Sequence, residues 1–357
     1  MSQLHTPLQI GSVQLPNRIF MAPLTRMRAF EQRSVGDLQV EHYRQRATAG
    51  LILTEATSVC PMGVGYPNTP GIWSAQQVAG WKRVTDAVHA AGGHIAVQLW
   101  HVGRISDPEL LDGQLPVAPS AIAAEGDVSV LRPKRPYAVP RALETAEIAG
   151  IVQDFVQAAR NAKEAGFDFI EVHAANGYLF DQFLHEGSNQ RTDQYGGSIE
   201  NRARFLLETV DALLKEWPAE RIGVHLNPMS NTHSMSDSNP VALFTYVAEQ
   251  LQARKLGFIF SREELKDGVL PIGQHMRQVF KGVFIANDSF TAEQAQAVVA
   301  TGAADAVAFG RAFIANPDLP ERIAKGAAWN ELNALTIYSP DATGYNDYPT
   351  LEQLQAK

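Results

Sequence analysis

The chain has 357 residues, of which 45% are hydrophobic and 19% are charged, an ordinary composition for a globular protein with a large buried core. Its formal net charge of −8 argues against nucleic acid or an anionic membrane as the main partner. The single cysteine, Cys60, excludes an intramolecular disulfide and a cysteine-ligated cluster, and we predict no metal site.

The first segment, Met1–Gly11, is polar and lacks the charged and then apolar pattern of a secretion signal. No apolar run approaches the length of a transmembrane helix. We therefore expect a cytoplasmic protein with no membrane partner.

Eight short apolar runs are spaced along the chain, and they are typical of parallel strands buried on both faces. In chain order they are Arg18–Leu24, Gly50–Thr57, His94–Trp100, Phe167–His173, Arg221–Asn227, Leu256–Phe260, Gly282–Asn287 and Ala304–Phe309. Amphipathic patterns between the runs predict helices, among them Gln76–Ala91, Ala146–Ala165, Asn201–Trp217 and Thr291–Thr301. The last of these begins with Thr291, a residue suited to cap a helix. Eight strand–helix units predict a single (β/α)₈ barrel domain over residues 1–357, because a doubly wound sheet rarely needs so many.

Two segments interrupt this alternation. Thr6–Pro16 reads as a small hairpin that could close the bottom of the barrel. Val102–Arg141, which follows the third strand and is rich in proline and glycine, is a long insertion. Since it leaves the carboxyl end of a strand, we expect it to cap the mouth where barrel enzymes carry their active sites.

Polar residues gather where the predicted strands end. The fourth strand runs without a turn signal into His173, Asn176 and Tyr178. A lone histidine at a strand end is more often structural than catalytic, but a barrel would bring several such ends around one mouth. The other ends are Pro23-Leu24-Thr25-Arg26, Glu55-Ala56-Thr57, Gln98-Leu99-Trp100-His101 and Gly310-Arg311. This convergence predicts an active site.

The residues at these ends, with others further along, resemble the Old Yellow Enzyme family of flavin-dependent ene-reductases, of the N-ethylmaleimide, nitrate-ester and xenobiotic reductase type. The matching motifs are P-L-T-R, E-A-T, Q-L-W-H, H-x-A-N-G-Y-L-x-x-Q-F-L, N-x-R-T-D-x-Y-G-G-S-x-E-N-R, D-A-V-A-F-G-R and G-Y-x-D-Y-P. They extend from about Leu8 to Pro349, and the segment Asn189–Arg202 is the most specific.

The resemblance implies an FMN bound non-covalently across the mouth of the barrel, reduced by NADPH or NADH. The residues that it assigns to the flavin are Pro23, Leu24, Thr25, Ala56, Gln98, His225, Asn287, Asp288, Gly310 and Arg311. Within this set Thr25 would tune the flavin ring, and Gly310 with Arg311 would hold the phosphate.

The resemblance also implies the substrate and its handling. Electron-poor alkenes such as enones, maleimides and nitroalkenes, together with nitrate esters, would be reduced in a ping-pong cycle. His173 and Asn176 would bind the oxygen of the activating group and Tyr178 would donate a proton. Trp100, Tyr66 and Tyr338 would line the pocket.

Two positions depart from the family pattern. His225 stands where the family usually has an arginine beside the flavin, and Asn287-Asp288 stand where it usually has small residues near the phosphate. Arg262, just past the sixth strand, could supply the charge that His225 lacks. These departures leave open an alternative, an FMN- or ligand-binding relative with weakened or lost turnover.

Two other barrel functions fit the sequence poorly. A Schiff-base aldolase or lyase needs a strand-end lysine, and none of the lysines stands at the carboxyl end of a predicted strand. The larger dienoyl-CoA reductase relatives carry an iron–sulfur cluster, which one cysteine cannot ligate. The sequence is compatible with a monomer or a homodimer.

Overall fold

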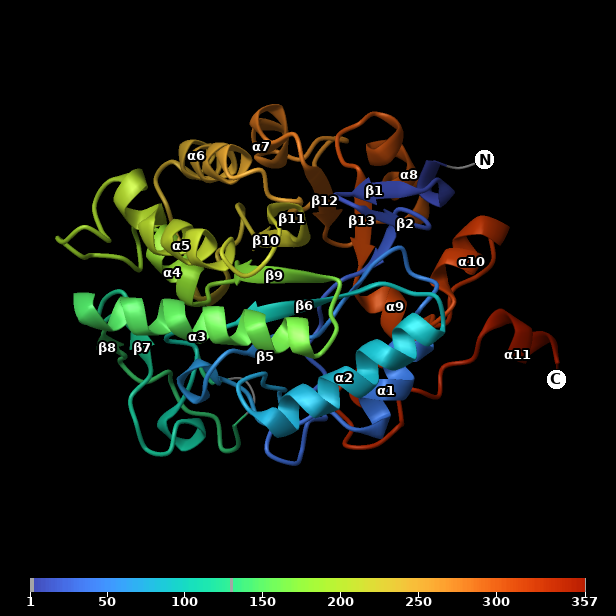
Figure 1. Ribbon diagram of the computed structural model, residues 1–357, viewed down its shortest axis with the longest axis horizontal. Helices are drawn as coiled ribbons and strands as arrows, with labels where there is room; N and C mark the ends of the chain where they lie inside the picture. The colour runs from blue at the N-terminus through green and yellow to red at the C-terminus, as the bar shows by residue number, and fades with distance from the viewer. Residues whose placement is uncertain (1–2, 129–130, 357) are drawn as a thin grey trace.

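Eight parallel strands pair edge to edge until the last meets the first, and so close into a barrel (Figure 1). The structure, a computed structural model, describes residues 3–128 and 131–356. The barrel strands are β3 (Ile19–Met21), β4 (Ile52–Leu53), β6 (Ile95–Trp100), β9 (Phe169–Ala174), β10 (Ile222–Leu226), β11 (Phe258–Arg262), β12 (Val283–Asn287) and β13 (Ala306–Phe309). The pairing of β4 with both β3 and β6 completes the ring. The predicted (β/α)₈ barrel is confirmed.

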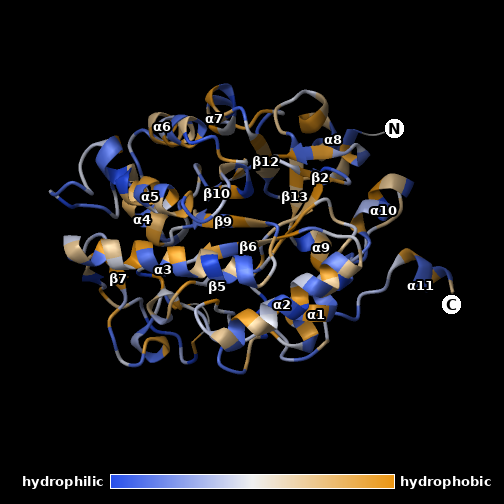
Figure 2. Cartoon of the chain, viewed as in Figure 1, coloured by the Kyte–Doolittle hydropathy of each residue, from blue (hydrophilic) through white to orange (hydrophobic). Residues whose placement is uncertain are grey.

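Helices surround the strands and carry both polar and apolar residues, whereas β9 and β13 are predominantly apolar (Figure 2). They are α1 (Asp37–Arg44), α2 (Ala75–Ala90), α3 (Thr145–Glu164), α4 (Leu179–Leu184), α5 (Ile199–Leu213), α6 (Pro240–Ala253), α7 (Gly273–Val279), α8 (Ala292–Ala300), α9 (Arg311–Ala315), α10 (Leu319–Lys325) and α11 (Leu351–Gln355). None of the helices in the described ranges is both long and apolar enough to cross a membrane.

The helix starts follow from local chemistry. The hydroxyl of Thr291 accepts a hydrogen bond from the backbone N–H of Gln294, while the Gln294 side chain returns to the backbone N–H of Thr291. Ser74 and Gln77 make the same reciprocal pair at the start of α2. These capping boxes satisfy backbone donors that a helix leaves unpaired, and the predicted cap at Thr291 is confirmed.

The hairpin near the N-terminus closes the bottom of the barrel, as predicted. Its strands β1 (Leu8–Ile10) and β2 (Val13–Leu15) pair antiparallel and bury alternate residues. The buried side chains pack in one cluster with Phe169 and Phe258, which begin β9 and β11 at the amino ends of the barrel strands. Because side chains fill the amino end of the barrel, an active site can form only at its carboxyl end.

The insertion after β6 covers the carboxyl end of the barrel. Val102, Ile105 and Tyr137 from this segment pack against Trp100, the last residue of β6. Two short strands, β7 (Val117–Ala118) and β8 (Arg141–Ala142), pair with each other and tie the middle of the segment to its end. Residues 129 and 130 of the predicted insertion lie outside the described residues.

Two strand boundaries differ from the prediction. The second predicted run divides into β4 and a separate strand β5 (Thr57–Ser58), which pairs with β6. The sixth predicted run ends at Phe260, yet β11 continues to Arg262, which pairs with Asn287 on β12. A prediction from apolar residues ends the strand too early here, because charged residues are uncommon in buried strands. Arg262 belongs to the barrel wall.

Candidate active site

A polar network crosses three adjacent barrel strands. Strand pairing sets His225 on β10 beside His173 on β9, and Gln98 on β6 beside Glu171 on β9. The Nε2 amide of Gln98 donates to the Glu171 carboxyl at 2.7 Å and to Nδ1 of His225 at 3.0 Å. The two imidazole rings stack with centroids 4.9 Å apart and planes 13° apart. All four side chains are buried.

Burial decides the charges in this network. It lowers the pKa of His173 to about 3 and that of His225 well below its ordinary value, and the cationic Arg262 adds to both effects. Burial likewise raises the pKa of Glu171 to about 8, partly offset by the hydrogen bond from Gln98. At neutral pH the network is therefore made of uncharged groups.

Aromatic side chains form a second cluster above this network. The hydroxyl groups of Tyr178 and Tyr66 lie 3.0 Å apart. The ring of Tyr178 meets both Trp100 and His173 edge-on, with centroids 5.0 Å apart in each case. Burial raises the pKa of Tyr178 above its ordinary value, so its phenol keeps its proton at physiological pH.

The turn after β9 sets the place of Asn176 and Tyr178. Asn176 and Gly177 both have positive φ, 57° and 76°, a backbone shape that asparagine and glycine adopt readily. The N–H of Gly177 donates to the Asp181 carboxylate at 2.8 Å. The side-chain amide of Gln182 donates to the carbonyl oxygens of both Gly177 and Val102, which joins the turn to the insertion. The Q in the motif G-Y-L-x-x-Q thus has a structural role.

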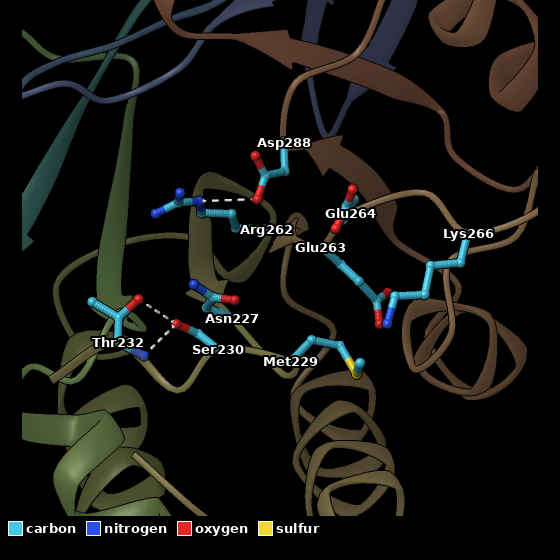
Figure 3. Close-up of a pocket in the computed structure, with 9 residues that line it drawn as sticks. All are labelled: Asn227, Met229, Ser230, Thr232, Arg262, Glu263, Glu264, Lys266 and Asp288. Atoms are coloured by element: carbon cyan, nitrogen blue, oxygen red, sulfur yellow. Dashed lines mark hydrogen bonds and ion pairs between the residues drawn. The ribbon is translucent and has the colours of Figure 1, made fainter. Parts of the chain in front are cut away.

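A cavity of about 220 Å³ opens beside Asn176 at the carboxyl ends of β10 and β11, and it is lined in part by Asn227, Ser230, Arg262 and Asp288 (Figure 3). The Nε atom of Arg262 lies 3.5 Å from the carboxylate of Asp288. The same guanidinium reaches back to the side-chain oxygen of Asn176 through Nη1 at 3.3 Å. Asp288 therefore pairs with Arg262 and not with Arg311.

The side chains expected around a flavin lie at the carboxyl ends of their strands. Pro23, Leu24 and Thr25 follow β3 and are half-buried, and Leu24 lies against Gly310, which follows β13. Ala56 is buried beside Trp100. Arg311, which begins α9, is exposed. The amide of Asn287 donates to the carbonyl oxygen of Ala308 at 2.8 Å, a bond that ties β12 to β13.

A family model described as NADH:flavin oxidoreductase / NADH oxidase matches residues 3–330 of the chain. The chain belongs to this family, that of Old Yellow Enzyme. Its cofactor is FMN and its reductant a nicotinamide. The predicted class of enzyme, an NAD(P)H-dependent ene-reductase of the Old Yellow Enzyme type, is likewise confirmed.

Individual relatives are similar in sequence to this chain over nearly its whole length. A flavin mononucleotide-dependent alkene reductase described as probable, from Leishmania infantum, is 43% identical, with 96% of each chain covered. A 12-oxophytodienoate reductase 1 from Oryza sativa subsp. japonica is 42% identical over 98% of this chain and 94% of the relative. The solved structure of morphinone reductase in complex with tetrahydroNAD superposes with a TM-score of 0.93 at 52% identity, covering 98% of this chain and 97% of that one.

The most family-specific motif, Asn189–Arg202, proves structural in this Old Yellow Enzyme. Asn189 donates to the carbonyl oxygens of Phe183 and Tyr195. Arg202 binds the carbonyl oxygen of Leu184 at 2.7 Å and the Asp237 carboxylate at 2.9 Å. These bonds hold the loop between α4 and α5.

Tyr338 stands apart from the other predicted lining residues. Its side chain is exposed, and in the described part of the chain it makes no ring contact or hydrogen bond with the aromatic cluster. It lies within electrostatic range of Tyr66 and Tyr178. It thus lies at the edge of the predicted pocket.

Three residues that contact or flank the predicted site were not predicted from the sequence, namely Glu171, Asn227 and His233. Glu171 precedes His173 by two positions, so strand alternation already puts both on the same face of β9. Asn227 donates to the side-chain oxygen of Asn176 at 2.5 Å, and the ring of His233 lies 2.7 Å from the Asn176 carbonyl oxygen. Only the folded structure shows these last two contacts.

Proposed function

We propose that this enzyme reduces electron-poor C=C bonds in enones, maleimides and nitroalkenes, and also reduces nitrate esters, in a ping-pong cycle with NADPH or NADH. The arrangement of Tyr178 beside His173 and Trp100 supports the proposal most directly. It puts a protonated phenol, neutral hydrogen-bonding side chains and apolar ring surface around one place, as a flat substrate with a single acceptor group requires.

The residues at the barrel mouth fit an FMN by their chemistry. Nδ1 of His225 accepts from Gln98, which leaves the proton on Nε2, and Nε2 has no partner among the described residues. A buried N–H without a partner suits a carbonyl oxygen of the flavin pyrimidine ring. Gly310 and Arg311 would hold the phosphate, and Pro23, Leu24, Thr25 and Ala56 would contact the ring.

His173 and Asn176 would bind the oxygen of the substrate's activating group. Nδ1 of His173 is buried and lacks a partner among the described residues. The side-chain oxygen of Asn176 accepts from Asn227 and Arg262, which leaves its NH₂ group to face the substrate oxygen. When bound, FMN would supply the hydride, and His173 and Asn176 would then face the oxygen on which negative charge builds up. Neutral donors already in place stabilise such charge, as in an oxyanion hole.

Tyr178 would deliver the proton that completes the reduction. Burial raises the pKa of its phenol, which keeps the group protonated, while the carbanion-like carbon of the substrate is far more basic. The hydroxyl of Tyr66, 3.0 Å away, can hydrogen-bond the Tyr178 oxygen as its proton leaves. Trp100 would shield this transfer from water, with Tyr338 at the edge of the pocket.

The names of relatives favour acceptors that carry an oxo group. Morphinone reductase and the 12-oxophytodienoate reductases are named for such compounds. By that likeness we propose cyclic enones as one substrate group for this chain, with 2-cyclohexenone as the simplest probe.

The test is to follow the flavin colour of the purified holoenzyme. NADPH or NADH should bleach the yellow absorption, and anaerobic addition of 2-cyclohexenone should restore it with formation of cyclohexanone. An alternative function is an FMN- or ligand-binding relative with lost turnover, suggested by His225 and by Asp288. That alternative requires bleaching without recovery by enones, maleimides, nitroalkenes or nitrate esters.

A further inference from the structure

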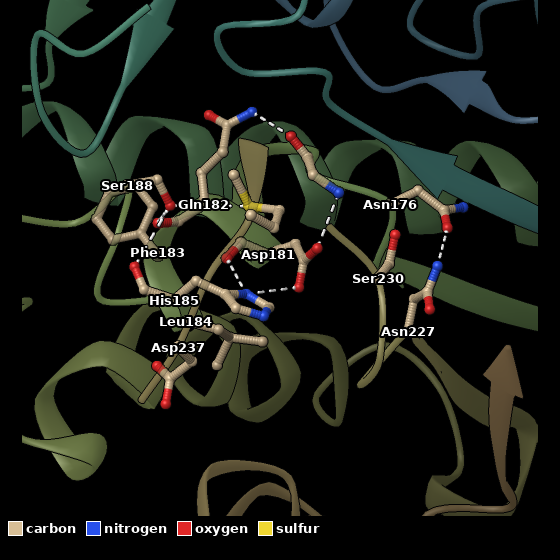
Figure 4. A network of polar contacts seen from close by, with 12 residues as sticks. Asn176, Asp181, Gln182, Phe183, Leu184, His185, Ser188, Asn227, Ser230 and Asp237 are labelled. Carbon is tan, nitrogen blue, oxygen red and sulfur yellow. Dashed lines mark hydrogen bonds and ion pairs between the residues drawn. The ribbon is translucent and has the colours of Figure 1, made fainter. Parts of the chain in front are cut away.

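The side-chain oxygen of Asn176 accepts two hydrogen bonds. One comes from the amide of Asn227 at 2.5 Å and the other from Nη1 of Arg262 at 3.3 Å. A guanidinium has only donors, so the atom of the carboxamide that faces it must be the oxygen. The NH₂ group of Asn176 consequently points the other way, as Figure 4 shows for the contact with Asn227.

The backbone of Asn176 is held as well. Its φ of 57° belongs to the left-handed region, and its carbonyl oxygen lies 2.7 Å from Nδ1 of His233. With the main chain fixed, the remaining freedom of this residue is rotation of its terminal amide, which is broad for asparagine. The two donors on the oxygen remove that freedom.

Contacts with the neighbouring strand β12 fix the orientation of the Arg262 side chain. It ends β11 in register with Asn287 of β12, and the following residue, Asp288, places its carboxylate 3.5 Å from the Arg262 Nε atom (Figure 3). The Arg262 side chain is 42% exposed, so solvent alone would leave its orientation free. The carboxylate holds one end of the guanidinium while the other end reaches Asn176.

We propose that Arg262 is a positioning residue for the oxygen-binding group, and that it keeps the Asn176 NH₂ turned toward the substrate oxygen. This inference rests on the proposed function. Without Arg262 the Asn176 oxygen keeps only Asn227, whose own carboxamide can offer either atom. The Asn176 amide can then rotate and present its oxygen to the substrate oxygen, and these two acceptors repel. Substrate and enolate-like ligands then bind more weakly.

The experiment uses the FMN-loaded enzyme and two probes. Binding of 4-hydroxybenzaldehyde, whose phenolate resembles an enolate, is titrated by its long-wavelength charge-transfer absorption, and 2-cyclohexenone gives KM and kcat. Arg262→Met should weaken phenol binding and raise KM by roughly three- to tenfold, the usual worth of one hydrogen bond. Arg262→Lys, which still offers only donors, should recover most of the loss.

A double-mutant cycle separates positioning from a general effect of charge. In an Asn176→Ala background, Arg262→Met should change the Kd of the phenol by less than about twofold, because no amide remains to be turned. Lys266→Met is the matched control, since it removes another cation from the same cavity. If Arg262→Met fails to bind FMN, Arg262→Gln replaces it, as a glutamine amide can offer either atom to Asn176.

Two results would overturn the inference. One is an unchanged phenol Kd in Arg262→Met or its replacement, and the other is an equal loss with and without Asn176. A wild-type enzyme that binds no phenol and is not reoxidised by any enone would instead refute the proposed function, so the two failures are distinguishable.

Discussion

His173 and His225 stack face to face on neighbouring strands, with ring centroids 4.9 Å apart. Two protonated imidazoles could not remain in such contact, and burial already lowers the pKa of each ring well below its ordinary value. Both rings therefore act as neutral hydrogen-bonding groups. A neutral His225, at a position where the resemblance implies an arginine, sets the electrostatic character of this part of the barrel.

This feature predicts the effect of His225→Arg on the flavin potential. Reduced FMN carries negative charge on its pyrimidine side, and a guanidinium stabilises that charge at every accessible pH. The midpoint potential should rise by tens of millivolts, since about 1.4 kcal/mol corresponds to roughly 30 mV for a two-electron couple. Spectroelectrochemistry of both proteins measures the shift.

The pH dependence provides the control for this prediction. Because burial keeps His225 neutral, wild type and His225→Arg should give parallel potential–pH lines between about pH 5.5 and 8.5, a range that brackets the ordinary histidine pKa. His225→Gln should stay near wild type. A wild-type line steeper than that of His225→Arg would show that the ring gains a proton as the flavin is reduced.

Tyr178→Phe should slow alkene reduction while leaving flavin reduction by nicotinamide nearly unchanged. General acid catalysis is typically worth about 10²–10⁴-fold, and less where water can replace the phenol. Stopped-flow absorbance measures the two half-reactions separately. Tyr66→Phe is the matched control, because it removes the neighbouring hydroxyl 3.0 Å away and should cost much less. A loss confined to the nicotinamide step would contradict the role of Tyr178.

Removal of either oxygen-binding residue should weaken enolate-like ligands. Asn176→Ala should cost roughly 1–3 kcal/mol of phenol binding, the usual cost of leaving a buried acceptor unpaired. His173→Ala should have a comparable effect, and the charge-transfer absorption gives both affinities. If both variants bind phenols as tightly as wild type, then His173 and Asn176 are structural residues only.

The barrel could be predicted because its signals are local. Apolar runs such as Phe167–His173 and capping residues such as Thr291 lie within single elements, and their order along the chain specified the fold. The cluster of His173, Asn176 and Tyr178 could be found for the same reason, as its members fall within six residues.

The partners of that cluster could not be predicted because they depend on strand register. The contact of Arg262 with Asn176 joins β11 to the turn after β9, and Glu171 remains protonated only because folding removes it from water. Sequence patterns indicate which residues lie on strands, but they do not show how two strand ends meet. The pairing of Asp288 with Arg262 and not with Arg311 has the same origin.

Glu171 makes the stability of the protein depend on pH. Its folded pKa of about 8 lies above the ordinary value of about 4.3, so its favourable contribution is complete below the ordinary value and is lost as pH rises through 8. Glu171→Gln keeps the neutral shape without titrating. The free energy of unfolding of the variant relative to wild type should therefore increase by more than about 1 kcal/mol between about pH 5 and 8.5.

Urea unfolding at the two pH values checks this prediction. Glu55, another buried carboxyl whose pKa is raised to about 7, titrates in both proteins and cancels in the difference. A difference that stays constant with pH would mean that Glu171 is ionised in the folded protein.

The backbone at Asp288 predicts a stability effect that contacts alone would not suggest. Its φ of 129° lies outside the regions open to residues with a side chain, and such a conformation costs of order 1–3 kcal/mol. The ion pair with Arg262 is half-exposed and contributes at most about 1 kcal/mol.

Asp288→Asn removes the charge and keeps the strain, whereas Asp288→Gly removes both. After the entropic cost of glycine, Asp288→Gly should still unfold with a free energy about 1 kcal/mol greater than that of Asp288→Asn. Ser289→Gly, at a φ of 56° that costs less, should gain less; equal stability of the two Asp288 variants would show that the main chain there carries no strain.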